Sequence, residues 1–559
     1  MESVRVLILY LAVPSLLFSA LRQILSWRNK GPSAKTTIPG PKQYPVVGRV
    51  HDLDRFQMWK KFKEWADIYG PIYRTSMLGQ QFVIVSDEKI AQELLTKRGH
   101  IYSGRPQIRA LFGHKTGAGY LALMDRTEIW TKQRKWVHAA MADFHRAHFH
   151  GVIEEEVKRY LAVLMLDPAK FHSNTREHCG RIMSRLAWDD ASMGKENGDS
   201  ADCTLTQMSV SGPLVNTMTP LWSIPWALNP WKKYERARED KQRAWWLNSL
   251  KVAKQRYLRG TLPTETWSFR YLDGLYKAGN TTLEQSEKDE EFASCMLGFH
   301  NLVGVITICG PMQFFLMAMT LNPEWQKKAQ EEIDRVCGDR MPTTADSPNL
   351  PTVRACLKET LRWRSGVPLG MFATVFAFLI RPKKTMSTWV RKIAAGTIVL
   401  ACEWLVLPLP PSANMSIDIC SLKRSMNRVA EVYPDPENYH PERYLEPGWP
   451  TFQEPLSRYP NFREGKGMHT FGWGRRTCLG QHIVDDEMFV SGAAVLWAFH
   501  LTRKRCPSTG QEIDFDSEAT NAHVILEPLP FPMDINPRGD MRAAHVLAGY
   551  AGVREKLKV

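Results

Sequence analysis

The stretch Phe471-Gly-Trp-Gly-Arg-Arg-Thr-Cys-Leu-Gly480 decides how the rest of this chain is interpreted. Its cysteine, Cys478, is flanked by Gly474 and Gly480, which give the backbone the conformational freedom for a tight turn. In such a turn, backbone N–H groups can point at the sulfur and tune a metal bound to it. Arg476 can make a charge-assisted hydrogen bond to an acidic group beside that metal. The stretch therefore predicts a thiolate ligand on a loop.

The alternative is that Cys478 is one buried structural cysteine among the ten of the chain. Spacing argues against it, because the pattern F-x-x-G-x-R-x-C-x-G is matched at every defined position. With this match the chain resembles the cytochrome P450 family of haem-thiolate monooxygenases. The resemblance implies that Cys478 is the axial ligand of the iron of haem b and that Arg476 contacts a haem propionate. Phe471, Gly474 and Gly480 would form the loop around the cofactor, with Phe471 keeping water from the sulfur.

The length and composition allow a large folded enzyme. A chain of 559 residues with 44% hydrophobic residues can bury one large core or several smaller ones. The net charge of +15 comes from Lys and Arg scattered among acidic residues, without a nucleic-acid-binding motif, so it favours a lipid surface or an acidic redox partner. The cysteines form no CxxC pair, which argues against a disulfide framework or a zinc cluster and favours a reducing compartment.

The N-terminus predicts a membrane anchor over residues 1–27, followed by a basic and proline-rich linker over 28–50 and a catalytic domain over 51–559. The apolar run from Val6 to Leu21 is long enough to cross a bilayer if Arg22 reaches its surface. Basic residues follow the run and predict a cytoplasmic catalytic domain. A signal peptide or a buried helix remains the alternative. Resemblance to microsomal family members implies a single-pass protein of the endoplasmic reticulum membrane.

Periodicity predicts the first elements of the domain. A helix is expected over 56–69, and the alternation over 72–85 predicts a β-hairpin with Gly79 at its turn. A helix over 128–141 places Trp130 and Arg134 on one face, at i and i+4. In the family such a pair meets a haem propionate, whereas the alternative is an ordinary solvated helix face.

The apolar segment over 292–320 predicts a long buried helix that ends before Asn322-Pro323. Within it, Gly304 and Thr307 match the oxygen-activation motif of the family, in which a glycine admits O2 and a hydroxyl relays a proton. The acidic residue of that motif is replaced by Ile306, which puts the usual proton route in question. The alternative for Thr307 is a hydroxyl bonded only to its own helical turn.

A structural cluster is expected behind the cofactor. Glu359 and Arg362 lie three residues apart on one helical face and can form an ion pair. Pro441-Glu-Arg-Tyr444 resembles the P-E-R-F element of the family, whose arginine, here Arg443, joins that pair. The three side chains would hold the loop before the cysteine without taking part in the reaction.

Two segments depart from the family pattern, 372–391 and 405–424. The second interrupts a stretch that otherwise continues from 401–404 to 425–430, and we predict a retained intron of 20 residues there. For the first, a reading frame shifted by one base permits the polar hairpin that belongs at this place, so we predict a frame error. Both segments are suspected gene-model artefacts, which sequencing of the transcript would test.

The resemblance implies a mainly α fold with smaller β-sheets, that is α+β, behind the anchor. It also implies insertion of one oxygen atom from O2 into an apolar small molecule, in fungal secondary-metabolite biosynthesis. Electrons from NADPH would come through a separate cytochrome P450 reductase, which Lys132 and Lys135 could help to steer. The alternatives are an O2-independent isomerase or dehydratase, suggested by Ile306, and a non-functional mis-spliced product.

Overall fold

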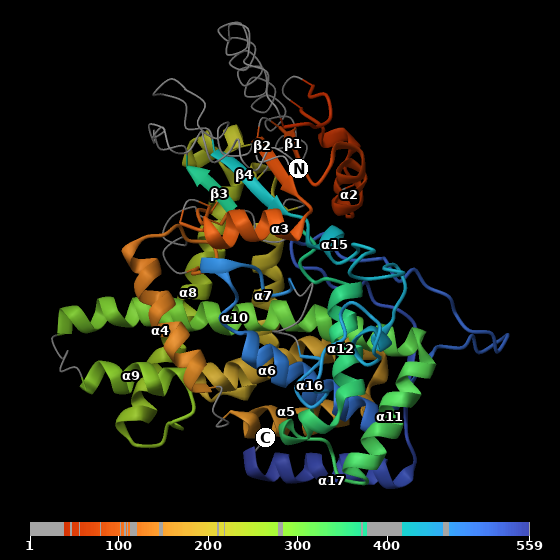
Figure 1. Cartoon of the computed structure of the whole chain (residues 1–559). Coiled ribbons are helices and arrows are strands. Elements are labelled where there is room, and N and C mark those ends of the chain that lie inside the picture. The colour runs from red at the N-terminus through yellow and green to blue at the C-terminus, as the bar shows by residue number, and fades with distance from the viewer. Residues whose placement is uncertain are drawn as a thin grey trace, which may run out of the picture.

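The computed structural model describes residues 38–44, 47–54, 56–78, 80–100, 102–105, 108, 110–111, 120–144, 149–209, 212–216, 219–277, 283–369, 373–376, 416–461 and 469–557. These residues form a mainly α-helical body with two small β-sheets (Figure 1). The expected fold class is therefore confirmed for the described part of the chain. The expected anchor over 1–27 lies outside the described residues.

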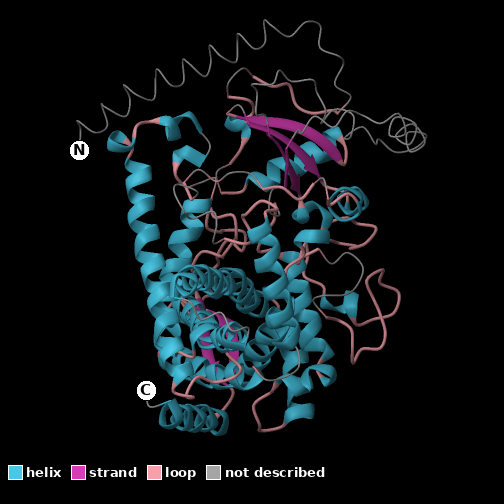
Figure 2. Ribbon diagram, turned by 90° about the vertical axis from the view of Figure 1, so that its left-hand side faces the viewer, coloured by secondary structure: helices cyan, strands magenta, loops and turns pink. Residues whose placement is uncertain are grey.

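The larger sheet lies at one end of the molecule (Figure 2). Its strand order is β1-β2-β4-β3, with β1 (Ile72–Met77) and β2 (Gln80–Val85) antiparallel. The predicted hairpin is thus confirmed, although Gly79 lies outside the described residues. Strand β4 (Ser416–Ser421) runs parallel to β2 and antiparallel to β3 (Ala373–Phe376). The smaller sheet pairs β5 (Phe499–Arg503) with β6 (Met533–Pro537).

The helical body includes the helices that the sequence predicted over 56–69 and 128–141. These are α2 (Met58–Tyr69) and α4 (Glu128–Phe144). The other α-helices are α3 (Glu88–Ala91), α5 (His150–Leu166), α6 (Phe171–Trp188), α7 (Gly194–Met208), α8 (Pro230–Leu258), α9 (Trp267–Lys277), α10 (Leu283–Leu321), α11 (Pro323–Cys337), α12 (Pro351–Trp363), α15 (Lys423–Met426), α16 (Gln481–Ala498) and α17 (Asp540–Leu557).

Helix α10 is the predicted long apolar helix, and it runs through the middle of the helical body (Figure 1). It packs against α6, α7, α8, α12 and α16. It ends directly before Asn322, because Pro323 cannot donate a backbone N–H to continue it and instead begins α11. Among the described residues, α10 contains the one segment long and apolar enough to cross a membrane, Glu290–Leu321, but this segment is mostly buried inside the protein. It is therefore a core helix.

The structure describes parts of both segments that depart from the family pattern. Strand β3 lies in the first, and β4 with the start of α15 lies in the second. Leu422 donates its backbone N–H to the carbonyl oxygen of Val85 at 2.8 Å, and Arg424 forms an ion pair with Glu518 at 2.7 Å. Residues 416–424 are thus joined to the sheet and to the C-terminal part of the chain. Residues 377–415 lie outside the described part, and the artefact hypothesis for them stays a prediction.

Candidate active site

The Cys478 loop is tied down on both sides of the sulfur. The backbone N–H of Cys478 donates to the carbonyl oxygen of Phe471 at 2.9 Å. Gly474 begins a 3-10 turn with φ +55°, and a Cβ there would lie 2.4 Å from the carbonyl oxygen of Leu95. Both the left-handed backbone and this close approach require glycine. Gly474 therefore has the role that the sequence predicted for it.

The same prediction was wrong for Gly480. Its φ is −86°, which any residue adopts, and a Cβ there would meet nothing within 4 Å. The second left-handed position of the loop is Gly472, with φ +74°. Gly480 contributes in another way, because its backbone N–H donates a hydrogen bond to the Cys478 sulfur.

The Cys478 side chain is exposed, yet the surrounding protein removes enough water that burial raises the pKa of the thiol. The Gly480 N–H and the cations of Lys423 and Arg134 act in the opposite direction and favour the thiolate. Burial itself lowers the pKa of Lys423 to about 8. The sulfur thus lies where a bound metal cation would complete the stabilisation of a thiolate.

Cationic side chains gather beside this loop. Arg134 donates from Nη2 to the carbonyl oxygen of Thr477 at 3.0 Å. Arg476 donates to the carbonyl oxygens of Ser103 and Met124. The guanidinium groups of Arg476 and Arg134 lie 4.4 Å and 5.6 Å from the ring centroid of Trp130. The predicted pair of Trp130 and Arg134 on one face of α4 therefore faces the cysteine loop.

Burial disfavours the charged form of the arginines in this cluster. Burial and the nearby cations of Arg105 and Arg134 together lower the pKa of Arg476 to about 9. Burial also lowers the pKa of Arg105 to about 10, with Asp125 acting in the opposite direction. Within the described residues, Arg476 Nη1 and Trp130 Nε1 are buried without a hydrogen-bond partner. The cluster therefore fits a ligand with more than one negative charge.

Haem b meets these requirements. Its two propionates would pair with the cations of Arg105, Arg134 and Arg476, and they would accept a hydrogen bond from the Trp130 indole. Its iron would meet the accessible Cys478 sulfur. The residues present thus fit this cofactor.

Helix α10 presents one partly accessible stripe. From Ala293 to Thr320 every residue is buried except His300, Val303, Gly304 and Thr307. These positions follow the spacing i, i+3, i+4 and i+7, so they lie on one face of the helix. Gly304 and Thr307, the predicted oxygen-activation residues, both belong to this stripe, whereas Ile306 is buried with 4% of its surface exposed.

Thr307 and Gly304 each also make a structural contact. The Thr307 hydroxyl donates to the carbonyl oxygen of Val303 at 2.9 Å, which is the bond to its own turn that the sequence left open as an alternative. Because a hydroxyl has one proton, its oxygen can still accept a hydrogen bond from a ligand. At Gly304 a Cβ would lie 2.1 Å from the sulfur of Met183 on α6, so this glycine permits close packing of α10 against α6.

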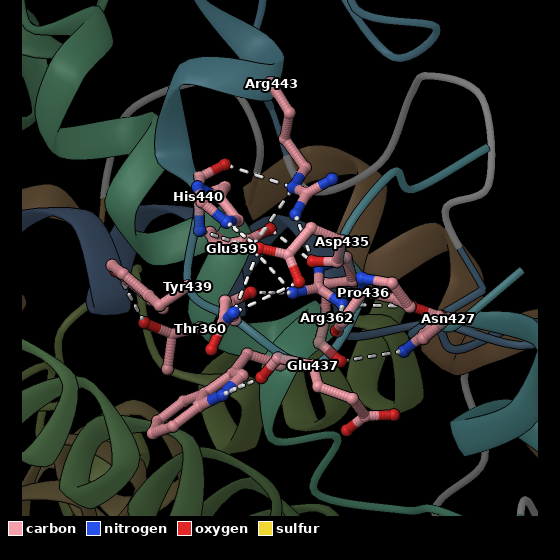
Figure 3. Close-up of polar contacts among 12 residues, drawn as sticks. Glu359, Thr360, Arg362, Asn427, Asp435, Pro436, Glu437, Tyr439, His440 and Arg443 are labelled. Atoms are coloured by element: carbon pink, nitrogen blue, oxygen red, sulfur yellow. Dashed lines mark hydrogen bonds and ion pairs between the residues drawn. The ribbon is translucent and has the colours of Figure 1, made fainter. Parts of the chain in front are cut away.

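The predicted cluster of Glu359, Arg362 and Arg443 is assembled and fully enclosed (Figure 3). Arg362 makes a bidentate pair with the Glu359 carboxylate at 2.7 and 2.8 Å, and Arg443 reaches the same carboxylate at 3.2 Å. The remaining guanidinium N–H groups donate to main-chain carbonyl oxygens, including those of Pro434 and Pro436. The cluster therefore fixes the path of the chain before the cysteine loop.

Sequence reasoning missed Arg105, Lys423 and His300. Arg105 carries no motif, and only the fold brings it to the cluster at the cysteine loop. Lys423 was assigned to the segment 405–424, yet its Nζ donates to the carbonyl oxygen of Thr470 at 3.0 Å beside the loop. The spacing of His300 with Gly304 and Thr307 was the one available signal, since i, i+4 and i+7 share a helical face.

Helix α16 contains a buried carboxyl group that predicts a pH-dependent stability. Glu487 has no exposed surface, and burial raises its pKa to about 8, with the Cys179 thiol acting in the opposite direction. The folded state thus holds a proton that the unfolded chain releases near pH 4.5. We expect the contribution of Glu487 to stability to be complete below about pH 4.5 and to be lost as pH rises towards 8.

Thermal melting measured from pH 5 to 9 would check this expectation. Glu487→Gln should remove the loss of stability that comes from ionisation of Glu487. Above pH 8 its melting temperature should therefore be higher than that of the parent protein. Asp514→Asn is the matched control, because the Asp514 side chain is 89% exposed. A parent profile that is unchanged by Glu487→Gln would contradict a protonated carboxyl at this position.

Comparisons with known proteins agree with this geometry. The family model described as Cytochrome P450 matches residues 38–405 and 416–525, so it includes 416–424 and omits 406–415. Cytochrome P450 monooxygenase virE of Hypocrea virens is 28% identical over 94% of this chain and 90% of its own length. Similar proteins of Armillaria gallica and Aspergillus ruber, also cytochrome P450 monooxygenases, are each 26% identical over 94% of this chain.

The match extends over most of the chain and includes the cysteine loop, the arginine cluster and the stripe on α10. The relatives that align over nearly their full length are fungal monooxygenases. The chain therefore belongs to the cytochrome P450 family of monooxygenases, whose cofactor is haem.

Proposed function

We propose that this enzyme inserts one atom of O2 into an apolar small molecule in fungal secondary-metabolite biosynthesis, with electrons from NADPH through a separate reductase. One observation carries the proposal. The accessible thiol of Cys478 lies on the same loop as Arg476, whose buried Nη1 makes no hydrogen bond to a described residue and suits a propionate of a haem. The similarity to fungal monooxygenases supports the proposed role in secondary metabolism.

Each set of residues has a distinct task in this proposal. Cys478 would bind the haem iron, and Arg105, Arg134, Arg476 and Trp130 would hold the propionates. When bound, thiolate-ligated haem supplies the oxidising chemistry that activates O2. The Thr307 hydroxyl holds and passes a proton on the stripe of α10, and Gly304 lets α10 pack closely against Met183 of α6 beside it.

The partner and membrane assignments rest on exposed residues. Lys132 and Lys135 are exposed on α4, the helix that also carries Arg134, and would attract an acidic reductase to that side. Trp226 and Leu228 are 41% and 51% exposed, in a segment of short 3-10 helices, and suit contact with a lipid interface. With an anchor over 1–27, these features support a location on the cytoplasmic face of the endoplasmic reticulum membrane.

Co-expression with an NADPH–cytochrome P450 reductase tests the proposal. The reduced protein with carbon monoxide should show the long-wavelength Soret band of thiolate-ligated haem. Extracts should yield a product that carries one 18O atom when 18O2 is supplied. Turnover without NADPH and reductase would contradict the monooxygenase reaction and would indicate an O2-independent rearrangement.

Removal of the Thr307 hydroxyl should separate oxygen reduction from product formation. Thr307→Ala removes the proton donor of the stripe, and we expect product formation to fall by about 10²-fold, the lower end of the effect of a positioned proton donor. Because electron delivery is untouched, NADPH consumption should continue with release of hydrogen peroxide. Thr307→Ser keeps the hydroxyl and should retain most of the product.

Product and peroxide measured against NADPH would check this prediction. Thr320→Ala is the matched control, because the Thr320 hydroxyl makes the same bond to its own turn, to Leu316 at 2.8 Å, but is buried away from the stripe. If Thr307→Ala forms as much product per NADPH as the parent protein, the proton reaches the site by another route.

A further inference from the structure

His300 is the polar side chain at the N-terminal end of the accessible stripe on α10. It lies seven residues before Thr307, on the same helical face, with Val303 and Gly304 between them. Seven residues of α-helix correspond to about 10 Å along the axis. A ligand that lies along the stripe with one end at Thr307 would therefore reach His300 with the other.

The hydrogen bond of one ring nitrogen fixes the chemistry of the other. His300 Nδ1 lies 2.7 Å from the carbonyl oxygen of Met296, and a carbonyl can only accept, so Nδ1 carries the proton. Burial lowers the pKa of His300 to about 4, which keeps the imidazole neutral at physiological pH. Nε2 is then an unprotonated acceptor, and it makes no hydrogen bond to another described residue.

Buried apolar residues lie beside His300 on α10. These are Phe299 and Met296, and the Phe299 ring lies 5.8 Å from the imidazole ring in an edge arrangement. An acceptor beside such residues favours a ligand that can donate, because a ligand that cannot donate leaves the acceptor without a partner once water is displaced.

We propose that His300 is a specificity-determining residue of this monooxygenase site, and that its Nε2 accepts a hydrogen bond from a hydroxyl or N–H group of the substrate. The inference rests on the proposed function and adds a substrate class to it. The substrate is an apolar molecule with one hydrogen-bond donor at the end that lies toward His300, about 10 Å along α10 from the end that lies at Thr307.

Binding of matched ligand pairs to the purified full-length haem protein tests this assignment. The probes are decan-1-ol, farnesol and 4-octylphenol, each compared with its methyl ether, which has lost the donor. Dissociation constants are measured from the shift of the ferric Soret band. At least one alcohol should bind about two- to tenfold more tightly than its ether, the value of one net hydrogen bond.

Three variants decide whether His300 is the acceptor. His300→Leu should bind that alcohol and its ether equally, and His300→Gln, which retains an acceptor, should keep part of the preference. His545→Leu is the matched control, because His545 is exposed on α17, and it should keep the full preference. Where decan-1-ol is turned over, the new oxygen should appear toward the end of the chain remote from the hydroxyl in the parent protein and be distributed more widely in His300→Leu.

Equal affinity for every alcohol and its ether in the parent protein would overturn the assignment, as would a preference that persists in His300→Leu. Each variant is first checked for the thiolate Soret band with carbon monoxide and for its melting temperature. Absence of that band from the parent protein would overturn the proposed function itself. Its presence, together with equal binding of alcohol and ether, would overturn the role of His300 alone.

Discussion

Serine in place of Cys478 should remove the long-wavelength Soret band of the reduced carbon monoxide complex and abolish monooxygenase turnover. The alcohol of serine has a much higher pKa than a thiol, so it cannot supply the electron-rich ligand that this chemistry needs. The loop itself should persist, because its contacts are made by the backbone of Cys478 and by Gly474, neither of which changes. Absorption spectra and product formation are the measurements.

Cys506→Ser is the matched control for this variant. Cys506 is a free cysteine in the hairpin region after β5, where hydrogen bonds from Ser508 and Thr509 lower the pKa of its thiol to about 6. It is thus the more acidic thiol, but it lies outside the site. Its replacement should leave spectrum and turnover unchanged. An unchanged Soret band in Cys478→Ser would place the iron ligand elsewhere in the chain.

Removal of the negative charge at Glu359 should have the largest effect on stability. Glu359→Gln leaves the guanidinium groups of Arg362 and Arg443 in the core without their anion, and both side chains are almost completely buried. Loss of one partner from a buried ion pair costs about 3–5 kcal/mol. This is a large part of the total stability of a folded protein, so we expect low soluble yield and little bound haem.

Urea unfolding and haem content per polypeptide would measure the effect. Asp240→Asn is the matched control, because Asp240 pairs with Arg236 at 2.9 Å on α8, where both side chains are about half exposed or more. An exposed i,i+4 pair contributes about 0.3–0.5 kcal/mol, so this variant should unfold like the parent protein. Similar unfolding of Glu359→Gln and Asp240→Asn would contradict a structural role for the buried cluster.

Local sequence patterns predicted much of the fold. The hairpin over 72–85 and the helix with Trp130 and Arg134 were found within a few residues of their predicted ends. The long apolar helix ends before Asn322 as predicted, but it begins at Leu283, nine residues before its expected start. Each is encoded by periodicity and by turn or stop residues within its own segment. The cluster of Glu359, Arg362 and Arg443 was also predicted, but that prediction required the known pattern of a family.

Features that depend on distant contacts were not predictable in the same way. Arg105 gains its significance only from neighbours such as Arg476, far away in sequence. The parallel pairing of β4 with β2 joins residues more than 330 positions apart, and nothing within 416–421 indicates it. The conformation of Gly480 differed from expectation because Gly480 is the N-cap residue of α16. Its φ is negative there, and a negative φ does not require glycine.

The long separations at the cysteine loop also bear on how the enzyme is made. Arg134 bonds to Thr477 across 343 residues, and Arg476 bonds to Ser103 across 373. At about 5–20 residues per second, the ribosome needs roughly 20–70 s to extend the chain from Arg134 to the cysteine. The cofactor pocket is therefore completed only after Cys478 has been synthesised, long after Arg134, so the early half of the chain waits for its partners before iron porphyrin can be captured.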